Sequence, residues 1–323
     1  MRYHHKFMLG MFAFLTAIGS AWAQQYPDRP IKWIVPYPPA GTTDVLARIV
    51  AQPLSEILGQ QVIVENRPGA GNNIGTEAVI KAAPDGYTML LVNPANGINA
   101  TLYKNLPFNF IRDIAPVAGI VRTPNVMVVP ANFPANNVAE FLAYCKNNVS
   151  KINMASSGSG TSVHMSGELF KSMTGCNMLH VPYKGAGPAV ASLLAGETQV
   201  MFSTPPAVMA QIKAGKLIAL SYSDTRRHAQ MPEVPTATEA GLGSFTHHGG
   251  WFGMFAPANT PLVVLNRLHQ EVRTAFANPQ FRERLEILGA DPVGNSPADF
   301  KIFVGTEIKR YVEMIRLAKI QPE

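Results

Sequence analysis

Ile31-Lys-Trp-Ile-Val-Pro-Tyr-Pro-Pro-Ala-Gly-Thr-Thr-Asp44 is the stretch from which the architecture of this chain can be worked out. Its first five residues, Ile31–Val35, are mostly apolar and predict a strand. A loop of small and polar residues, Pro36–Asp44, leads into the helical periodicity of Val45–Val50. A helix that begins after such a loop leaves backbone N–H groups unpaired at its start, and these groups bind anions.

A second stretch repeats this arrangement far along the chain. Ser156-Ser-Gly-Ser-Gly-Thr-Ser162 follows the strand-like Ile152–Ala155 and precedes the helix-like Val163–Phe170. The two loops are more than 100 residues apart in the sequence. They suggest two lobes that face one anion.

Strand-like and helix-like segments alternate outward from both loops. The nearly continuous apolar strands Ile31–Val35, Val62–Glu65 and Thr88–Val92, with helices between them, are typical of a parallel sheet covered on both faces. From about Pro116 the pattern starts again. The sequence therefore predicts an α/β fold with two lobes, two parallel-rich sheets and a hinge.

The order of the segments also predicts how the lobes divide the chain. Lobe 1 is expected to be discontinuous, formed by residues 24–121 and 223–323, with lobe 2 inserted between them as residues 122–222. Strands near Val117–Val121 and Leu217–Tyr222 are expected to cross between the lobes and form the hinge.

The first 23 residues have the pattern of an export signal. Arg2 and Lys6 precede an apolar run, Met8–Ile18, and Ala21-Trp-Ala23 is an A-x-A cleavage site. The apolar run is shorter than the roughly 20 residues that a membrane-spanning helix needs. We therefore expect cleavage near Ala23 and a periplasmic location. The rest of the sequence contains no run of 18 apolar residues, so it predicts no membrane-spanning helix.

The charge of the remaining chain argues against nucleic acid as a partner. Without Arg2 and Lys6, 25 of the 27 basic residues remain against 21 acidic residues, a net charge of +4. The basic residues are scattered and form no cluster or stripe. A mildly positive protein is compatible with a small anionic ligand.

Cys145 and Cys176 are the two cysteines of the chain. Each lies near the end of a predicted helix, so the sequence leaves open whether they form a disulfide bond or remain two buried thiols. Two cysteines are too few for a cysteine-rich zinc site.

Catalytic, metal and cofactor sites find little support in the sequence. No G-x-S-x-G motif accompanies His164, and the adjacent pair His247-His248 lacks metal-ligand spacing. The glycines of Gly69–Gly75 have one residue too many for a dinucleotide fingerprint and follow the second predicted strand. We therefore expect no catalytic residues, no bound metal and no cofactor.

Motifs spread over the whole exported part of the chain closely resemble the Bug family, the TctC-like solute-binding proteins of tripartite tricarboxylate transporters. The segments that carry the resemblance are Tyr26–Pro30, Val35–Gly41 with Asp44, Val64–Gly71, Pro84–Tyr87, Gly158–Thr161 with His164, Val181–Gly185, Ala214–Leu217, Pro232–Thr236 and Glu239–Gly241.

The resemblance implies a two-lobed periplasmic binding fold of the Venus-flytrap type, with a cleft that closes over one small carboxylate. It also implies that three loops supply the ligand-binding residues. The first loop contributes Pro39, Ala40, Gly41, Thr43 and Asp44, the second contributes Ser159, Gly160, Thr161 and His164, and the third contributes Tyr183, Lys184, Gly185 and Ala186.

The chain departs from the family pattern at several of these positions. Tyr37 and Ala40 replace a usual Phe and Gly of the first loop, and Ser203-Thr204 stand where the family often has Asp. A neutral hydroxyl at that position suits a different distal group on the ligand. Asn93, which follows the third strand, is polar and is also expected to line the cleft.

Asp44 has two interpretations that the sequence leaves open. Its carboxylate caps the helix that follows, or it faces the cleft and meets a ligand amine or hydroxyl.

We therefore expect a monomeric receptor that captures a small carboxylate and delivers it to a membrane permease. A sensory adaptor for a membrane histidine kinase would use the same cleft and stays an alternative. A secreted enzyme of the same fold is the least favoured hypothesis.

Overall fold

The computed structural model describes residues 26–103, 105–148, 152–243, 245, 249–317 and 320. The expected signal peptide and its cleavage site lie outside these residues. None of the helices in the described part of the chain combines the length and the apolar character needed to cross a bilayer.

The first sheet has six strands in the order β11-β4-β10-β3-β1-β2. Strand β1 pairs in parallel with β2 and β3, whereas β10 runs antiparallel to both β3 and β4. The strands span Ile31–Val35 (β1), Val62–Asn66 (β2), Thr88–Val92 (β3), Ile114–Pro124 (β4), Gly249–Pro257 (β10) and Asp291–Pro292 (β11).

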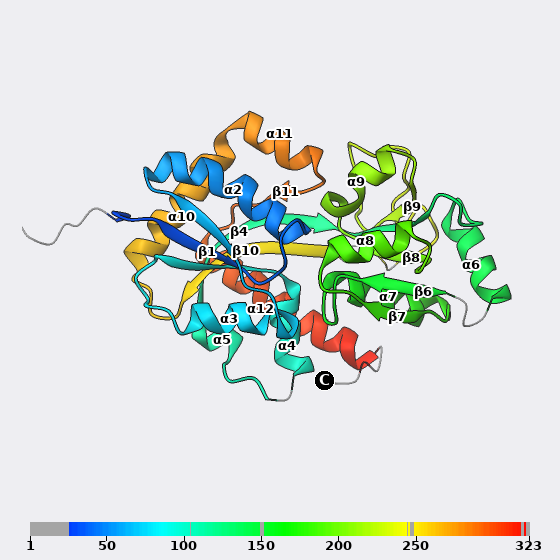
Figure 1. Cartoon of the computed structure of the whole chain (residues 1–323), viewed down its shortest axis with the longest axis horizontal. Helices are drawn as coiled ribbons and strands as arrows, with labels where there is room; N and C mark the ends of the chain where they lie inside the picture. The colour runs from blue at the N-terminus through cyan, green and yellow to red at the C-terminus, as the bar shows by residue number, and fades with distance from the viewer. Residues whose placement is uncertain are drawn as a thin grey trace, which may run out of the picture.

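Helices cover both faces of this sheet because successive side chains of its strands point to opposite faces. Trp33 and Val35 pack with α2, α10 and α11, while Ile34 packs with α3, α5 and α12. Figure 1 shows these two helical layers on either side of the sheet. The helices of this part are α2 (Thr42–Leu58), α3 (Asn73–Ile80), α4 (Pro94–Leu102), α5 (Phe110–Asp113), α10 (Leu262–Ala277), α11 (Pro279–Ile287) and α12 (Pro297–Leu317), with a short 3₁₀ turn, η2 (Ala70–Asn72).

The second sheet has five strands in the order β7-β6-β8-β5-β9. Strand β6 pairs in parallel with β7 and β8, and β5 runs antiparallel to β8 and β9. Its elements are β5 (Val126–Pro130), α6 (Val138–Asn147), β6 (Asn153–Ser156), α7 (Ser162–Thr174), β7 (Leu179–Pro182), α8 (Ala186–Leu194), β8 (Val200–Ser203), α9 (Pro205–Lys213) and β9 (Leu217–Tyr222).

Each sheet has its own apolar cores, so the chain forms two lobes (Figure 1). A smaller apolar cluster joins them: Ile98 and Leu102 of α4 pack with Met165 of α7 and with Tyr311 of α12. The C-terminal helix α12 therefore touches both lobes, on the side where α4 meets α7.

Both sheets are mixed rather than parallel-rich. The reason is the path of the chain between the lobes. Strand β4 leaves the first sheet and continues through Asn125 into β5, and β10 returns into the first sheet beside it. Since the outgoing and returning strands run in opposite directions, they pair antiparallel, from Gly249 with Pro124 to Pro257 with Ile114.

The second connection between the lobes differs from the one that the sequence predicts at Leu217–Tyr222. Strand β9 pairs with β5 at the edge of the second sheet, and the segment after it stays there. Met231 and Phe245, for example, pack in the cores of the second sheet. We therefore propose a lobe boundary between Phe245 and Gly249 in place of the expected boundary at 222/223.

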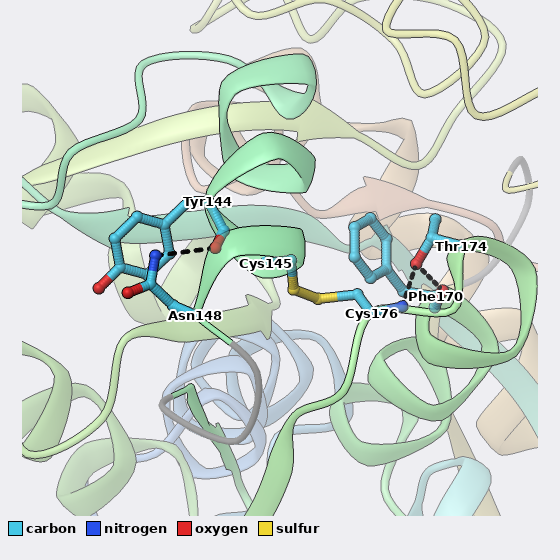
Figure 2. The surroundings of a disulfide bond; sticks show 6 residues. All are labelled: Tyr144, Cys145, Asn148, Phe170, Thr174 and Cys176. Carbon is cyan, nitrogen blue, oxygen red and sulfur yellow. Dashed lines mark hydrogen bonds between the residues drawn. A yellow bond between two sulfur atoms is a disulfide. The ribbon is translucent and has the colours of Figure 1, made fainter.

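A disulfide bond joins Cys145 at the end of α6 to Cys176 just after α7, with the two Cα atoms 5.7 Å apart. Figure 2 shows the bond between the ends of these two helices. The loop that leads to Cys176 is held by a hydrogen bond of 3.2 Å from the Cys176 N–H to the Thr174 hydroxyl. The disulfide thus ties together two helices of the second lobe.

Candidate functional site

The first loop ends at a helix start that no side chain caps. Gly41 is the N-cap residue of α2, and no side chain accepts a hydrogen bond from the first turn of this helix. The N–H groups of a first helical turn have no partner within the helix. The start of α2 is therefore able to donate hydrogen bonds to an anion, and the positive end of the helix dipole favours a negative charge there.

Asp44 fixes the shape of this loop. Its carboxylate accepts hydrogen bonds from the Arg48 guanidinium at 3.0 and 3.1 Å, from Asn66 Nδ2 at 2.9 Å and from the Ala40 N–H at 2.9 Å. Burial raises the pKa of Asp44, but these hydrogen bonds outweigh it, so the pKa lies below its usual range. Ala40 has a φ of +64°, a left-handed conformation that favours glycine, and the bond to Asp44 holds it there. Asp44 therefore supports the first loop but does not cap α2, contrary to the first of its two interpretations, and a contact between Asp44 and a ligand stays a prediction.

The helix start that follows the second loop is capped by a side chain of that loop. The Thr161 hydroxyl accepts a hydrogen bond of 3.3 Å from the His164 N–H at the start of α7 and donates one of 2.8 Å to the Gly158 carbonyl. Gly160 has a φ of +74°, and a Cβ added there would lie 3.2 Å from Asn99 Oδ1 and 3.1 Å from Leu102. Gly160 therefore lies against α4 of the other lobe, where a larger residue would crowd the contact.

Two histidines lie behind the second loop. His164 and His180 stack with ring centroids 3.8 Å apart. His164 Nδ1 accepts a hydrogen bond of 3.1 Å from the Gly160 N–H, and His180 Nε2 lies 2.6 Å from the Ser156 hydroxyl. Burial, with His180 and Lys171 nearby, lowers the pKa of His164 to about 3. His164 is therefore neutral at ordinary pH and holds the loop.

The third loop ends at another helix start without a side-chain cap. Gly185, with a φ of +106°, is the N-cap residue of α8, and no side chain bonds the first turn of this helix. The Gly185 N–H is itself directed to Ser157 O at 3.2 Å and Tyr183 O at 2.9 Å, which ties the third loop to the second. Lys184, next to this helix start, is exposed.

Two hydroxyls meet where the lobes approach each other. Thr42, at the start of α2, lies with its Oγ1 2.9 Å from Oγ1 of Thr204, the N-cap residue of α9. Ser203, one residue earlier, is buried and donates to the carbonyl of Thr204 at 3.3 Å. Thr42 was not among the residues expected from the sequence, although it stands next to Gly41.

Tyr37 and Asn93 form a buried polar pair beneath the first loop. The Tyr37 hydroxyl donates to Asn93 Oδ1 at 3.3 Å and accepts a hydrogen bond of 2.8 Å from Asn72 Nδ2. Burial raises the pKa of Tyr37. Asn93 also caps α4, because its side chain accepts from the Ala95 N–H at 3.0 Å. The start of α4 is therefore already satisfied by its own cap.

These loops enclose two adjoining cavities, which we call the first and the second cavity. The first has a volume of about 50 Å³ and the second a volume of about 490 Å³. Six residues line both of them: Tyr37, Pro38, Ser157, Thr161, Lys184 and Gly185. Because these residues come from both lobes, the cavities lie in an interlobe cleft.

The cavities bring together twelve of the seventeen residues that the sequence predicts for the ligand site. The first cavity is lined by Tyr37, Pro39, Gly41, Thr43, Asn93, Thr161, Lys184, Gly185, Ala186 and Thr204, and the second adds Ser159 and Tyr183. The other five lie outside both linings, and they are Ala40, Asp44, Gly160, His164 and Ser203.

Several lining residues were missed from the sequence. Phe252 lines the first cavity although it belongs to β10, more than 200 residues after the first loop. Its segment, Trp251–Phe255, is compatible with a pocket wall, but the sequence favours a place in the core because large apolar residues are usually buried. Thr42 and Ser157 do stand inside the two loops that the sequence identifies, so their position was the available signal.

Among the described residues, no group of three or more His, Cys, Asp or Glu side chains is arranged to hold a metal ion. His247 and His248, weighed above as metal ligands, lie outside those residues.

Comparison with known proteins supports the expectations from the sequence motifs. Residues 46–320 match a family described as the tripartite tricarboxylate transporter family receptor. Protein BugT of Bordetella pertussis is 35% identical over 312 residues, which cover 96% of this chain and 95% of BugT.

Solved structures of related proteins have the same fold as this chain. R. palustris Rpa4515 with adipate has a TM-score of 0.89 and 32% identity, over 92% of this chain and 100% of that one. MatC (Rpa3494) from Rhodopseudomonas palustris with bound malate has a TM-score of 0.84 and 30% identity, over 90% of this chain and 100% of that one. The expected two-lobed α/β fold of periplasmic binding proteins is thereby confirmed.

Proposed function

Because this chain belongs to the receptor family of the tripartite tricarboxylate transporters, we propose that it is a periplasmic solute-binding protein. It captures a small organic carboxylate in the cleft between its lobes and delivers it to the membrane permease of such a transporter. The carboxylates named for two structural relatives, adipate and malate, support a carboxylate as the ligand here.

One observation carries the proposal. The starts of α2 and α8 come from different lobes, neither has a side-chain cap, and residues of both line the first cavity. Two uncapped helix starts supply backbone N–H donors and two positive dipole ends to one small space. Lys184 adds a positive charge at the edge of the same cavity. A carboxylate satisfies these donors better than a neutral ligand does, since hydrogen bonds to a charged acceptor are stronger.

The same arrangement explains why closure of the cleft depends on the ligand. With the lobes apart, α2 and α8 each offer donors to water. With the lobes together, one anion accepts from both, so the ligand binds the closed form more tightly than the open form and shifts the population toward it. The contact between Thr42 and Thr204 forms only when the lobes meet.

Isothermal titration with a panel of carboxylates and neutral sugars tests the ligand class. We expect at least one carboxylate to bind with an affinity that falls as salt increases, and no sugar to bind. Lys184→Met should weaken carboxylate binding several-fold. Lys213→Met on α9, whose Nζ contacts Gln230, should leave it unchanged. Sugar binding without any carboxylate binding would overturn the proposal.

Delivery to a permease is tested with the permease in membrane vesicles. We expect uptake of labelled carboxylate to require the receptor, and the carboxylate to be recovered chemically unchanged. Binding to a histidine-kinase ectodomain without stimulation of uptake would favour a sensory role, and chemical conversion of the ligand would favour an enzyme.

We also propose that the receptor acts as a monomer, since one chain supplies both sides of the cleft. Light scattering with and without ligand should give the mass of one chain, and a stable dimer would contradict this.

A further inference from the structure

We propose that the ligand is a monocarboxylate without an ammonium group, with its carboxylate in the first cavity and a larger uncharged part in the second. This inference rests on the proposed function and specifies its ligand.

The volumes of the two cavities indicate that each holds a different part of the ligand. A cavity needs a volume of roughly 10–15 Å³ to hold one group of atoms the size of a water molecule. The first cavity, at about 50 Å³, therefore holds about four such groups, enough for a carboxylate and its neighbouring carbon. The second cavity is almost ten times larger, at about 490 Å³. Because residues such as Tyr37 and Lys184 line both, a ligand with more atoms extends from the first into the second.

The charges around the cavities limit what the ligand carries. No Asp or Glu is among the described residues that line either cavity, and Lys184 is the one charged residue in both linings. An ammonium group in the cleft would lose water without gaining a negative partner, and this is costly. Asp44, the acidic residue of the first loop, is outside both linings and already accepts hydrogen bonds from Arg48 and Asn66.

A second carboxylate would also lack a partner. Lys184 is the one cation among the described lining residues, it borders both cavities, and the uncapped start of α2 lines the first cavity alone, so we expect the first carboxylate to bind both of them. The start of α7 offers no free donors to a second carboxylate, because the hydroxyl of Thr161, which lines both cavities, caps it. A dicarboxylate would therefore place a charge where no second cation compensates it.

The walls of the second cavity suit an uncharged carbon chain or ring. Pro36, Pro68, Tyr103 and Tyr183 contribute apolar rings and aromatic faces. The Tyr37 ring, which borders both cavities, is fixed through its hydroxyl by Asn72 and Asn93. Its position is therefore set before the ligand arrives. A rigid wall of this kind selects for the shape of the ligand rather than for its charge.

Titration calorimetry with three ligands of six carbon atoms each, hexanoate, adipate and 6-aminohexanoate, separates the possibilities. They differ at the far end, which is a methyl, a carboxylate or an ammonium group. We expect hexanoate to bind at least tenfold more tightly than the other two, and at least tenfold more tightly than propionate. Equal or tighter binding of adipate or 6-aminohexanoate would overturn this inference but leave the proposed function standing. Absence of binding by every carboxylate would overturn both.

A variant that fills the second cavity tests the placement. Ser159 lines the second cavity but not the first, so Ser159→Phe should weaken hexanoate at least tenfold and propionate less than twofold. Ser172→Phe, at an exposed position of α7, is the matched control and should change neither. Equal weakening of both acids by Ser159→Phe would contradict the placement of the uncharged part. Circular dichroism checks that both variants fold.

Discussion

Thr42 and Thr204 connect the two lobes through a hydrogen bond between their side-chain hydroxyls, 2.9 Å apart. Both residues line the first cavity, and both stand at helix starts, Thr42 in the first turn of α2 and Thr204 at the N-cap of α9. The bond closes the cleft beside the place where the ligand is expected.

Thr204→Val should therefore favour the open form. A typical hydrogen bond contributes about 1 kcal/mol, so the ratio of closed to open molecules should fall about fivefold. Small-angle X-ray scattering at a carboxylate concentration that half-saturates the unmodified protein should show a larger radius of gyration for Thr204→Val. Thr204→Ser keeps a hydroxyl and should resemble the unmodified protein; identical scattering from all three would show that the bond does not hold the cleft closed.

Tyr37→Phe should destabilise the first lobe. The change removes the hydroxyl that accepts from Asn72 Nδ2, and it leaves that buried donor without its partner. We expect a loss of about 1–2 kcal/mol in the free energy of unfolding, measured by urea denaturation. Tyr87→Phe removes an exposed hydroxyl that donates to Asp28, and it should cost less than about 0.5 kcal/mol. Equal losses in the two variants would argue against a special role for the buried network.

His164 should make stability depend on pH. Its pKa is about 3 in the folded protein against 6.5 ordinarily, so below pH 6.5 the unfolded chain binds a proton that the folded chain does not. The stabilising effect is complete above pH 6.5 and is lost as the pH falls toward 3, by about 1.4 kcal/mol per pH unit.

His164→Asn removes this titration while its Oδ1 can still accept from the Gly160 N–H. Urea denaturation of both proteins between pH 4 and 8 should give a shallower pH dependence for the variant, by about 1.4 kcal/mol per unit below pH 6.5. His228 and His269, whose pKa values are also lowered by burial, contribute equally to both curves. Parallel curves would show that His164 does not titrate in this way.

Loss of the disulfide should destabilise the second lobe without affecting the cleft. Cys145 and Cys176 are 31 residues apart, and closing a loop of this length stabilises a protein by about 3–4 kcal/mol through the unfolded state. The double variant Cys145→Ala, Cys176→Ala should lose stability of this order in thermal or urea denaturation. Since neither cysteine lines a ligand cavity, carboxylate affinity at 25 °C should stay within twofold. A large loss of affinity in the folded variant would mean that the two regions are coupled.

The sequence predicts some elements of this protein well because their causes are local. The strand Ile31–Val35 agrees with β1, and the helix predicted over Val138–Asn147 agrees with α6, because Asn137 caps it. The loop at Gly41 leaves the start of α2 without a side-chain cap, as the sequence predicts. The same prediction for the loop Ser156–Ser162 is wrong, because the Thr161 hydroxyl caps α7. The helix Pro94–Leu102 was missed, although Asn93 and Asn96 form a capping box at its start.

Other features depend on contacts between distant parts of the chain. The segment after Tyr222 was expected in the first lobe, but its N–H bonds hold it to the second: Ala237 N–H donates to Tyr222 O at 2.8 Å. The roles of Asp44 and His164 also depend on such contacts. Each has a polar side chain that would suit a ligand. Instead, Asp44 accepts a hydrogen bond from the Ala40 N–H and His164 accepts one from the Gly160 N–H, so each side chain supports its own loop.

The amino-acid sequence by itself determined the alternation of strands and helices, the two Gly-rich loops that precede helix starts, the family motifs and the mild positive charge, because each of these depends on residues near one another along the chain. The tertiary structure alone decided that β10 returns beside β4, that Thr42 meets Thr204, and that one small and one large cavity adjoin at Tyr37. These features arise from packing between segments far apart in the sequence, and no local pattern of residues encodes which of them meet.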